Sequence, residues 1–344
     1  MHLSIMSLNE NFKGFIGKEI FTDILGQDST KRQLLSGLLV SRHLIIVGPP
    51  GIGKTTLAKN VAKLLPDLIV NDCNFNCLPE EPLCPECKSN KTKKTKKIRG
   101  IERFVRVQGS PDLTVEDLLG DIDPIKALKF GPLSVDAFTP GKIFKANNGV
   151  LFFDEINRAP EKLQNALLEI LEEKKATLGS YDVEFPANFI LIGSMNPEDF
   201  AGTEKLSEVF LDRFDIIYMH YPENIEIERN IVKLKSKTFK EIKFNENLLN
   251  NALDFIGHLR NHKDIERAPS VRVSIGLYER AQSNALIAGR KEVIKQDIQE
   301  ALISVLSHRI RLKPSVKYLI SNEEFIKKEA KEFLDLKESS GDLP

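Results

Sequence analysis

The chain has 344 residues, 49 of them basic and 49 acidic, and its formal net charge at pH 7 is zero. This length favours two domains, and zero net charge excludes a strong overall field that would attract nucleic acid or a membrane surface. No stretch approaches the roughly 20 apolar residues that a membrane span needs. The first residues also lack a basic start followed by an apolar core. We therefore expect a cytoplasmic protein with no signal peptide and no membrane span.

The first strong motif is a glycine-rich loop near the start of the chain. A helix is predicted within residues 21–40, and a short apolar strand at 44–47 leads into the loop. The loop matches the pattern G-x-x-x-x-G-K-[ST], and a helical pattern follows it, which is the context that a phosphate-binding loop requires. The predicted nucleotide site consists of Gly48, Pro49, Pro50, Gly51, Ile52, Gly53, Lys54, Thr55 and Thr56.

The chemistry of this loop follows from its residue types. Glycines let backbone N–H groups close around phosphate oxygens, and the N-terminus of the next helix adds a partial positive charge. We expect Lys54 to reach the β- and γ-phosphates of ATP and the Thr55 hydroxyl to bind Mg²⁺. The structural alternative, a glycine turn with a surface lysine, does not explain the strand before the loop or the helix after it.

All four cysteines lie in an excursion of the chain at about 66–103. Their clustering, without an export signal, argues against a disulfide scaffold and favours a reducing cytosol. Two close pairs separated by a short loop suit four thiolates around tetrahedral zinc, and a structural zinc would stabilise a loop with little core of its own. A reversible disulfide and four unliganded thiols are the alternatives to the favoured zinc site at Cys73, Cys77, Cys84 and Cys87.

A basic run follows the cysteines, with seven basic residues and no acid in Lys88–Arg99. We interpret it as a solvated, mobile loop. Contact with nucleic acid or an acidic partner is the alternative, and the absence of interleaved aromatic residues weakens the nucleic-acid case.

The second chemical element is the sequence VLFFDE at 150–155. Its four apolar residues predict a strand buried on both faces, and two acids stand at the C-terminal tip, where ligands bind in open α/β sheets. Asp154 suits the Mg²⁺ shell and Glu155 suits the polarisation of an attacking water. Because neighbouring side chains on a strand point to opposite sides, we expect one carboxylate to face the metal and the other the water.

Further elements follow in the order helix, hairpin and strand. An amphipathic helix is predicted at 161–173, a β-hairpin at 177–185, and a buried strand at 189–193 that runs into Asn196. If the strands are neighbours, Asn196 lies beside the two acids and could orient water or the γ-phosphate. Nothing in the sequence pattern itself makes Arg213, before the last predicted strand, more than a surface ion-pair residue.

Strand signals disappear after Pro222, and helices are predicted at 223–235, 246–260, 271–289, 294–311 and 323–336. The fold class is therefore α/β, with a mainly parallel sheet, followed by an all-α domain. We place the boundary between the two near residue 222.

Taken together, these motifs resemble those of the AAA+ ATPases, over about residues 20–312. The stretch Asp154–Pro160 is similar to that of the MoxR ATPases, whereas Gly193–Pro197 and the cysteine-bearing excursion are similar to magnesium-chelatase I subunits. The resemblance implies a three-layer AAA+ domain over 1–222, with an insertion at about 66–103, and a helical lid over 223–344.

The resemblance also implies roles for single residues. Asn196 corresponds to the sensor 1 residue, Arg213 to the arginine finger that enters the neighbouring subunit's ATP site, and Arg272 to the sensor 2 arginine of the lid. It further implies a hexameric ring and a separate partner that carries a von Willebrand factor A-type domain.

The expected activity is Mg²⁺-dependent hydrolysis of ATP that drives the remodelling of a partner protein, as in a chelatase or a maturation chaperone. The segment around Gly120–Thr139 is predicted to be a helix interrupted by a hairpin or loop, and it resembles the helix-2 insert of this family. A DNA-stimulated motor is the alternative function, because related helicases share this insert and the hairpin at 177–185. A nucleotide-gated scaffold that barely hydrolyses ATP is a third reading, against which Glu155, Asn196 and Arg213 argue.

Overall fold

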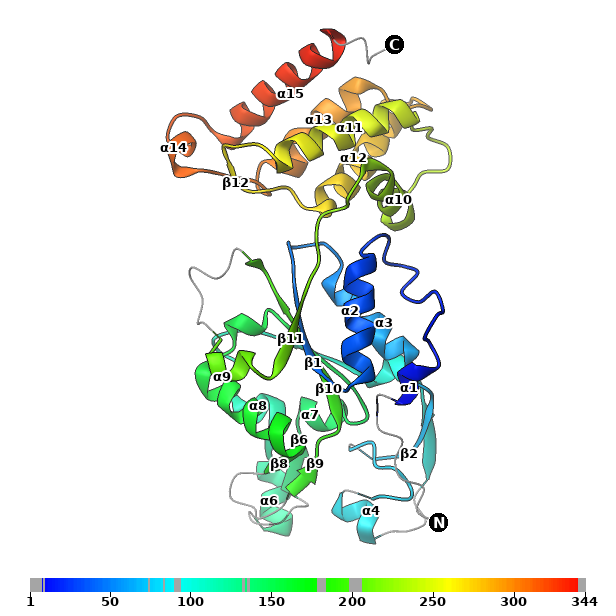
Figure 1. The fold of residues 1–344 in the computed structure, drawn as a ribbon, viewed down its shortest axis with the longest axis vertical. Helices are drawn as coiled ribbons and strands as arrows, with labels where there is room; N and C mark the ends of the chain where they lie inside the picture. Colours follow the sequence, from blue (N-terminus) through cyan, green and yellow to red (C-terminus); the bar gives the residue numbers. More distant parts are fainter. Residues whose placement is uncertain are drawn as a thin grey trace. The chain divides into compact units, whose positions relative to one another are not determined.

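The computed structural model describes residues 8, 10–73, 75–82, 84–89, 94–131, 134, 137–177, 184–197 and 206–339. The chain divides into two compact units: Met1–Gly48 with Gly53–Met219, and Pro49–Ile52 with His220–Pro344 (Figure 1). Within the described part, the helices are too short or too polar to cross a bilayer.

A five-stranded parallel sheet forms the centre of the first unit, in the order β11-β1-β10-β7-β4. Because all neighbouring strands are parallel, their C-terminal ends meet at one edge of the sheet, where ligands bind in open α/β folds. This confirms the predicted α/β class and brings the ends of separate motifs together. The strands are β1 (His43–Val47), β4 (Phe104–Gln108), β7 (Gly149–Asp154), β10 (Phe189–Met195) and β11 (Phe214–Tyr218).

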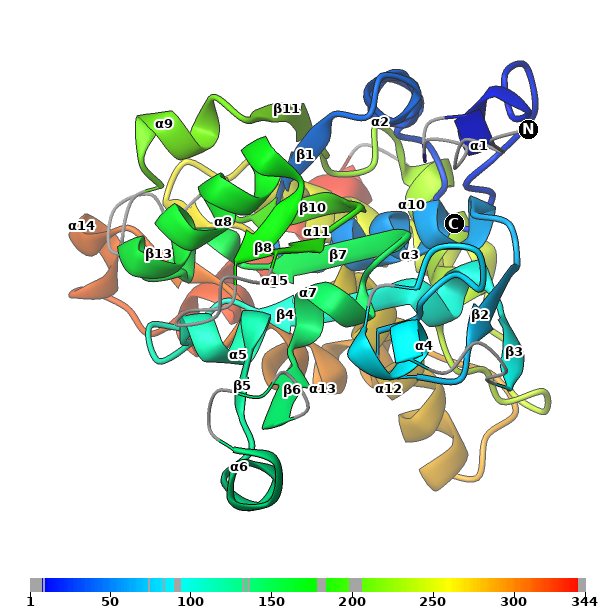
Figure 2. The same ribbon diagram turned by 90° about the horizontal axis from the view of Figure 1, so that it is seen from below.

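Helices cover both faces of this sheet (Figures 1 and 2). One face packs on α2 and α3, and the other on α7 and α8, whose apolar residues share a core with Ile45, Leu151 and Phe153. Leu44, one residue before Ile45, faces α2 instead, because strand side chains alternate. The helices are α2 (Asp28–Leu39), α3 (Lys54–Leu64), α7 (Lys142–Lys145) and α8 (Glu161–Glu173); α1 (Glu10–Lys13) and α9 (Glu208–Leu211) are shorter additions.

The first predicted helix, within residues 21–40, corresponds to α2. Residues 21–27 are not helical, and α2 begins at Asp28. Phe21 and Gln27 have left-handed backbone angles, with φ of 62° and 60°. A residue in that region cannot continue a right-handed helix, and α2 accordingly lies within the predicted range 21–40 and after Gln27.

The cysteine-bearing insertion forms a small substructure on β2 (Leu68–Asn71), which pairs antiparallel with β3 (Thr95–Ile98), and on α4 (Pro85–Ser89). The prediction of a mobile loop for the basic run is wrong for 95–98, which form a strand. The ammonium of Lys96 lies 3.0 Å from Asp72 Oδ1 and that of Lys97 3.0 Å from Asp67 Oδ2, so the acids that flank the opposite strand pair with this part of the run. Residues 90–93 of the run lie outside the described chain.

Buried Arg103 closes the insertion at its base, just after β3 and within the 3₁₀ turn η1 (Gly100–Arg103). Its guanidinium donates to the carbonyl oxygens of Pro66 and Asn148, and burial lowers its pKa to about 10. The chain therefore leaves and re-enters the sheet domain at neighbouring points.

Two further excursions agree with the predicted pattern. The segment between β4 and β7 is a helix interrupted by a two-stranded hairpin, formed by α5 (Val115–Leu119), β5 (Gly120–Ile122), α6 (Pro124–Phe130) and β6 (Phe138–Pro140). Strands β8 (Lys175–Thr177) and β9 (Glu184–Pro186) pair antiparallel as predicted, and the tip at Gly179–Ser180 lies outside the described residues.

The second unit is helical, with the addition of a two-stranded ribbon, β12 (Ile265–Arg267) and β13 (Arg311–Leu312). Its core joins apolar residues such as Phe255, Leu277 and Leu302 from three helices. The helices are α10 (Ile225–Lys235), α11 (Glu246–Arg260), α12 (Val271–Ile287), α13 (Lys295–Leu306), α14 (Pro314–Lys317) and α15 (Asn322–Ser339).

A buried ion pair ties three of these helices together. Arg260 of α11 donates two hydrogen bonds to Glu228 of α10, at 2.6 and 2.7 Å, and the Ser274 hydroxyl of α12 donates to the same carboxylate. The Arg260 Nε donates to the Pro269 carbonyl oxygen at 2.9 Å. This network therefore fixes the short segment that precedes α12.

Candidate functional site

The glycine loop connects the end of β1 to the start of α3. Gly51 and Gly53 have φ of 76° and 109°, a region that disfavours residues with a Cβ. A Cβ added to Gly48 would lie 2.7 Å from the Met219 carbonyl oxygen, which is closer than such atoms approach. The backbone of the loop therefore requires glycine at these positions.

Lys54 is the first residue of α3 and is buried, with 8% of its surface exposed. Its ammonium donates to the Gly48 carbonyl oxygen at 2.5 Å and to Asn196 Oδ1 at 2.7 Å. Asn196 follows directly after β10, the neighbour of β1 in the sheet. The structure thus brings together two predicted site residues that are far apart in the sequence, while Thr55 and Thr56 continue the first turn of α3.

The two acids lie at the end of β7, but their geometry differs from the predicted alternation. The strand ends at Asp154, and Glu155 has φ 53° and ψ 51°, a left-handed turn that begins the 3₁₀ helix η3 (Ile156–Arg158). A Cβ added to Gly109 would lie 2.0 Å from the Glu155 carbonyl oxygen, so glycine is required for this close approach. The two carboxylates therefore point in different directions because of this turn, and not because side chains alternate along a strand. Residues with strained backbone angles of this kind cluster at functional sites.

Ser194 joins the two acids. Its hydroxyl donates to Asp154 Oδ1 at 2.5 Å and accepts the Glu155 backbone N–H at 3.0 Å. Arg106 of β4 holds the other Asp154 oxygen, with Nη2 at 2.5 Å from Oδ2. Sequence reasoning missed both residues.

Two further side chains hold the Glu155 carboxylate. Gln108 Nε2 donates to Oε2 at 3.1 Å, and Arg158 Nη1 donates to the same oxygen at 3.0 Å. Gln108 is the last residue of β4 and lies opposite Asp154 in the sheet register. The available signal was its place directly after residues 104–107, whose apolar pattern predicts a strand.

Of the two other predicted arginines, one belongs to each unit. Arg213, between α9 and β11, pairs with Glu172 of α8 and with Asp212. Arg272 lies in the first turn of α12 in the second unit. There its side chain lies beside Gly51, because a Cβ on that glycine would come within 2.9 Å of Arg272 Cγ.

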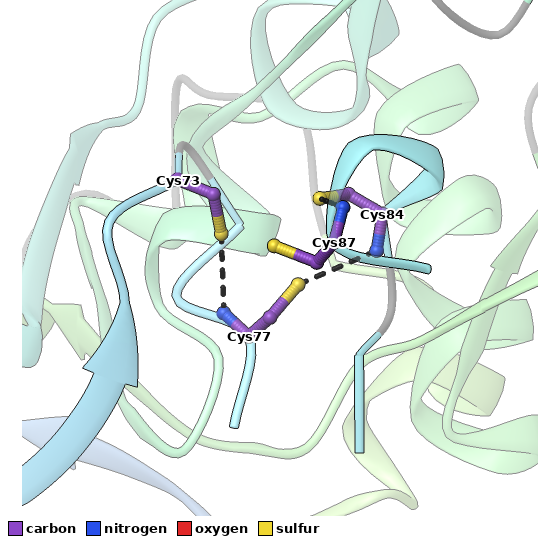
Figure 3. A group of neighbouring side chains, drawn as sticks. All are labelled: Cys73, Cys77, Cys84 and Cys87. Atoms are coloured by element: carbon purple, nitrogen blue, oxygen red, sulfur yellow. Dashed lines mark hydrogen bonds between the residues drawn. The ribbon is translucent and has the colours of Figure 1, made fainter. Parts of the chain in front are cut away.

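The four cysteines converge although they come from separate turns of the insertion (Figure 3). Their sulfur atoms gather around a common space, no two more than 4.8 Å apart, and three of the four residues are buried. Tetrahedral Zn–S bonds of 2.3 Å require sulfur atoms about 3.8 Å apart. The donor set and its spacing therefore fit a zinc ion.

Hydrogen bonds among the cysteines prepare them to carry negative charge. Backbone N–H groups of Cys77, Cys84 and Cys87 donate to the sulfur atoms of Cys73, Cys77 and Cys84, at 3.3 to 3.4 Å. The hydrogen bond from the Cys77 side chain is the main cause that lowers the pKa of Cys73 to about 5, and burial raises that of Cys87 to about 12. One thiol of the group is thus ready to ionise, and another keeps its proton until a cation displaces it.

Family models match three parts of the chain. The model described as "ATPase family associated with various cellular activities (AAA)" matches residues 85–216, the AAA lid domain matches 258–329, and "Magnesium chelatase, subunit ChlI" matches 20–76. These matches include the glycine loop, the two acids at the end of β7 and residues 258–329 of the helical unit, whereas residues 77–84 of the insertion, with Cys77 and Cys84, lie between two matched ranges.

Curated relatives are similar over nearly the whole chain. An uncharacterized protein of Bacillus subtilis, YeaC, is 26% identical and covers 91% of this chain and 92% of its own length. Chaperone MoxR1 of Mycobacterium tuberculosis is 26% identical, with 86% and 74% covered. The chloroplastic magnesium-chelatase subunit ChlI of Oryza sativa is 29% identical, with 86% and 76% covered.

Proposed function

The chain belongs to the AAA+ ATPases, in the group of the magnesium-chelatase I subunits and the MoxR proteins, and we propose that it couples ATP hydrolysis to the remodelling of a partner protein. The observation that carries the proposal is the bond between Lys54 and Asn196 beside the acids of β7. This hydrogen bond joins the phosphate-binding loop after β1 to a polar residue at the end of β10, the neighbouring strand in the sheet. Both lie at the C-terminal edge of the sheet, where substrates bind in open α/β folds.

In this proposal each side chain has one task in phosphoryl transfer to water, where positioning and charge neutralisation do most of the work. Lys54 binds the β- and γ-phosphates and moves from Gly48 to do so. Glu155 holds the attacking water, and Asn196 aligns it with the γ-phosphate. Thr55 and Asp154 offer the oxygen ligands that Mg²⁺ prefers, and the bound ion neutralises phosphate charge.

Gln108 and Arg158 position Glu155. They donate to one carboxylate oxygen, Oε2, and leave Oε1 to accept a hydrogen bond from water. The left-handed turn at Glu155 also brings its backbone N–H within hydrogen-bonding distance of the Ser194 hydroxyl. This hydrogen bond fixes the backbone of Glu155, as Gln108 and Arg158 fix its carboxylate.

We further propose that Arg213 completes the site of a neighbouring subunit in a hexameric ring. Its side chain is 38% exposed and is held by Glu172, which keeps it at the surface of the first unit. An arginine supplied to the γ-phosphate in this way raises hydrolysis about 10³–10⁵-fold. Arg272 has a different proposed role, that of the sensor 2 arginine of the helical unit, where Ser274 and the Arg260–Glu228 pair fix the first turn of α12.

A mixing experiment tests the shared site. Arg213→Ala should bind ATP but lose hydrolysis at least about 10³-fold, and Glu155→Gln should bind ATP without hydrolysing it. Mixing the two should restore turnover, because some junctions then combine an intact Glu155 with an intact Arg213. Arg42→Ala, which removes an exposed arginine at the opposite end of β1, is the matched control. Normal hydrolysis by Arg213→Ala, or no recovery on mixing, would refute the shared site.

The partner that we propose is a separate protein with a von Willebrand factor A-type domain. An apolar surface on α6 supports a protein contact: Ile125, Leu128 and Phe130 are 79%, 90% and 48% exposed. The DNA-stimulated motor is not favoured, since the named sequence relatives are a chaperone and a chelatase subunit. ATPase activity that rises with DNA, and not with a co-purified protein, would reverse this choice.

We also propose that the four cysteines hold a structural zinc ion in a reducing cytoplasm. The convergence of the four sulfur atoms and the N–H···S hydrogen bonds support this proposal, because structural zinc sites have four protein ligands and no open coordination position. Phe75, within this segment, packs against Phe144 of α7, with 5.6 Å between ring centres. The ion therefore stabilises an insertion that contacts the main core.

A further inference from the structure

A second group of metal-ligand side chains lies in the helical unit, on α11 and α15. His258 stands in the last turn of α11, His262 follows one turn later, and Glu329 comes from the middle of α15. The Nε2 atoms of the two histidines lie 3.0 and 3.4 Å from Glu329 Oε2. No two of the three ligand atoms are more than 4.8 Å apart.

From this geometry we propose that His258, His262 and Glu329 bind a divalent transition-metal ion, such as Zn²⁺, Co²⁺ or Ni²⁺, that joins the end of α11 to α15. Two histidines four residues apart, combined with a carboxylate, are a known ligand set for zinc; here the first lies in α11 and the second just beyond its end. Bonds of 2.0–2.2 Å from one ion place neighbouring ligand atoms about 3.0–3.5 Å apart, and the distances to Glu329 fall in that range. Imidazole nitrogen with one carboxylate suits these ions better than Mg²⁺ or Ca²⁺.

The surroundings of Glu329 give the second reason. Its side chain is only 8% exposed, and among the described residues its ion-pair partners are the two histidines. Aromatic rings surround the group, with Phe333 at 5.5 Å from the His258 ring and Phe325 at 5.1 Å from the His262 ring. A buried carboxylate in an apolar shell requires compensating charge, and a divalent ion between the imidazoles supplies it.

The three ligands differ in how they meet an ion. His258 is 37% exposed, which leaves a path for the ion and a position for water beside the protein ligands. His262 Nδ1 accepts the Asp264 backbone N–H at 3.2 Å, so in the metal-free chain Nε2 carries the hydrogen and donates to Glu329. Metal binding moves that hydrogen to Nδ1 and breaks the Asp264 bond. We therefore expect weaker binding here than at the four cysteines.

Metal titration of the full chain tests the proposal, after the cysteine site has been filled with Zn²⁺ and excess metal removed. Added Ni²⁺ should bind at one further ion per chain, by calorimetry and by elemental analysis of the gel-filtered protein. Glu329→Gln keeps the shape of the ligand and removes its charge, and should weaken Ni²⁺ binding at least about tenfold. His308→Ala, which removes an exposed histidine of the same unit, is the control and should bind as the wild type does.

Hydrogen exchange gives a readout independent of the ion count. Ni²⁺ should slow exchange at the amides of α15 in the wild type and in His308→Ala, but not in Glu329→Gln. His258→Gln provides a second variant if Glu329→Gln folds poorly, because His258 is the most exposed of the three ligands. Equal Ni²⁺ affinity of wild type and both ligand variants, or no ion beyond the cysteine site, would overturn the proposal.

Discussion

Lys54 Nζ lies 2.7 Å from Asn196 Oδ1, so the first residue of α3 is bonded to the residue that follows β10. The same ammonium reaches back to Gly48 at the start of the glycine loop. The two hydrogen bonds hold the lysine at the C-terminal edge of the sheet, where we propose that the phosphates of ATP bind.

We predict that substitution of Lys54 impairs ATP binding, whereas substitution of Asn196 impairs mainly ATP hydrolysis. Lys54→Ala should abolish ATP binding, whereas Asn196→Ala should bind ATP within a few-fold of wild type and lose at least about 100-fold in kcat. Fluorescent-nucleotide binding and phosphate release measure the two effects. Lys59→Ala, which removes an exposed lysine of the same helix, is the control. An equal loss of ATP binding in both variants would instead show that Asn196 contributes to phosphate binding.

Gln108 offers a second prediction, because it orients Glu155 without touching the proposed substrate. Gln108→Ala should lower kcat about tenfold and leave the KM for ATP unchanged, since misplacing a catalytic group affects the transition state more than the ground state. Steady-state kinetics test this against Gln33→Ala, which changes an exposed glutamine of α2. Higher basal turnover in Gln108→Ala would show that the contact restrains Glu155.

Arg106 is paired with Asp154, the residue that we propose as a ligand of Mg²⁺. Its guanidinium is bonded to the Asp154 oxygen Oδ2, and its side chain is 52% exposed. An exposed pair of this kind contributes up to about 1 kcal/mol, so Arg106→Ala should lower the Mg²⁺ concentration for half-maximal ATPase activity by up to about fivefold. Titration of activity with Mg²⁺ at saturating ATP measures it. A higher Mg²⁺ requirement would mean that Arg106 supports the site.

The cysteine cluster should hold about one zinc per chain through purification in reduced, metal-replete buffer. Because the pKa of Cys87 is raised to about 12, zinc uptake at pH 7.5 should release its proton, which an indicator dye in weak buffer detects. Paired Cys84→Ser and Cys87→Ser substitutions should remove the metal and lower the melting temperature. Protein that carries no zinc under these conditions would refute the site.

His43, the first residue of β1, should make stability depend on pH. Burial, with the nearby charge of Lys174, lowers its pKa to about 4 from 6.5, and its Nδ1 accepts the Leu191 backbone N–H at 3.1 Å. The unfolded chain takes up a proton near pH 6.5 and the folded chain only near pH 4, so stability falls as the pH falls through this window.

Between pH 7 and pH 5 the free energy of unfolding should fall by about 2 kcal/mol through this residue. Urea unfolding at the two pH values measures the fall. His43→Asn keeps a hydrogen-bond acceptor but does not titrate, and should remove most of the difference. An unchanged pH dependence in His43→Asn would assign the effect to other groups.

Motifs with a strong local pattern were predictable from the sequence. The glycine loop, the acids after a buried strand and the long amphipathic helices all follow from spacing alone, as the match of α8 to residues 161–173 illustrates. The parallel sheet order then made it necessary that Asn196 and the acids meet at one edge. Their convergence is a property of the topology.

Features set by tertiary contacts were not predictable. The left-handed turn at Glu155 depends on Gly109 lying against its carbonyl group, and the two are 46 positions apart. In the same way β3 is a strand because β2 pairs with it, although lysines dominate its sequence. The side chains of Gln108 and Arg106 gain their partners only from the register of β4 beside β7.

Arg103 gives the cysteine-bearing insertion a narrow stem. Because its side chain bonds the Pro66 and Asn148 carbonyl oxygens, the polypeptide returns to its point of departure before β4 begins. The cost of closing a loop grows only slowly with its length, so segments of different size can be exchanged on this stem while the ATPase sheet keeps its register. The stem at Arg103 therefore allows the length of the insertion to change with little effect on the strand order of the sheet.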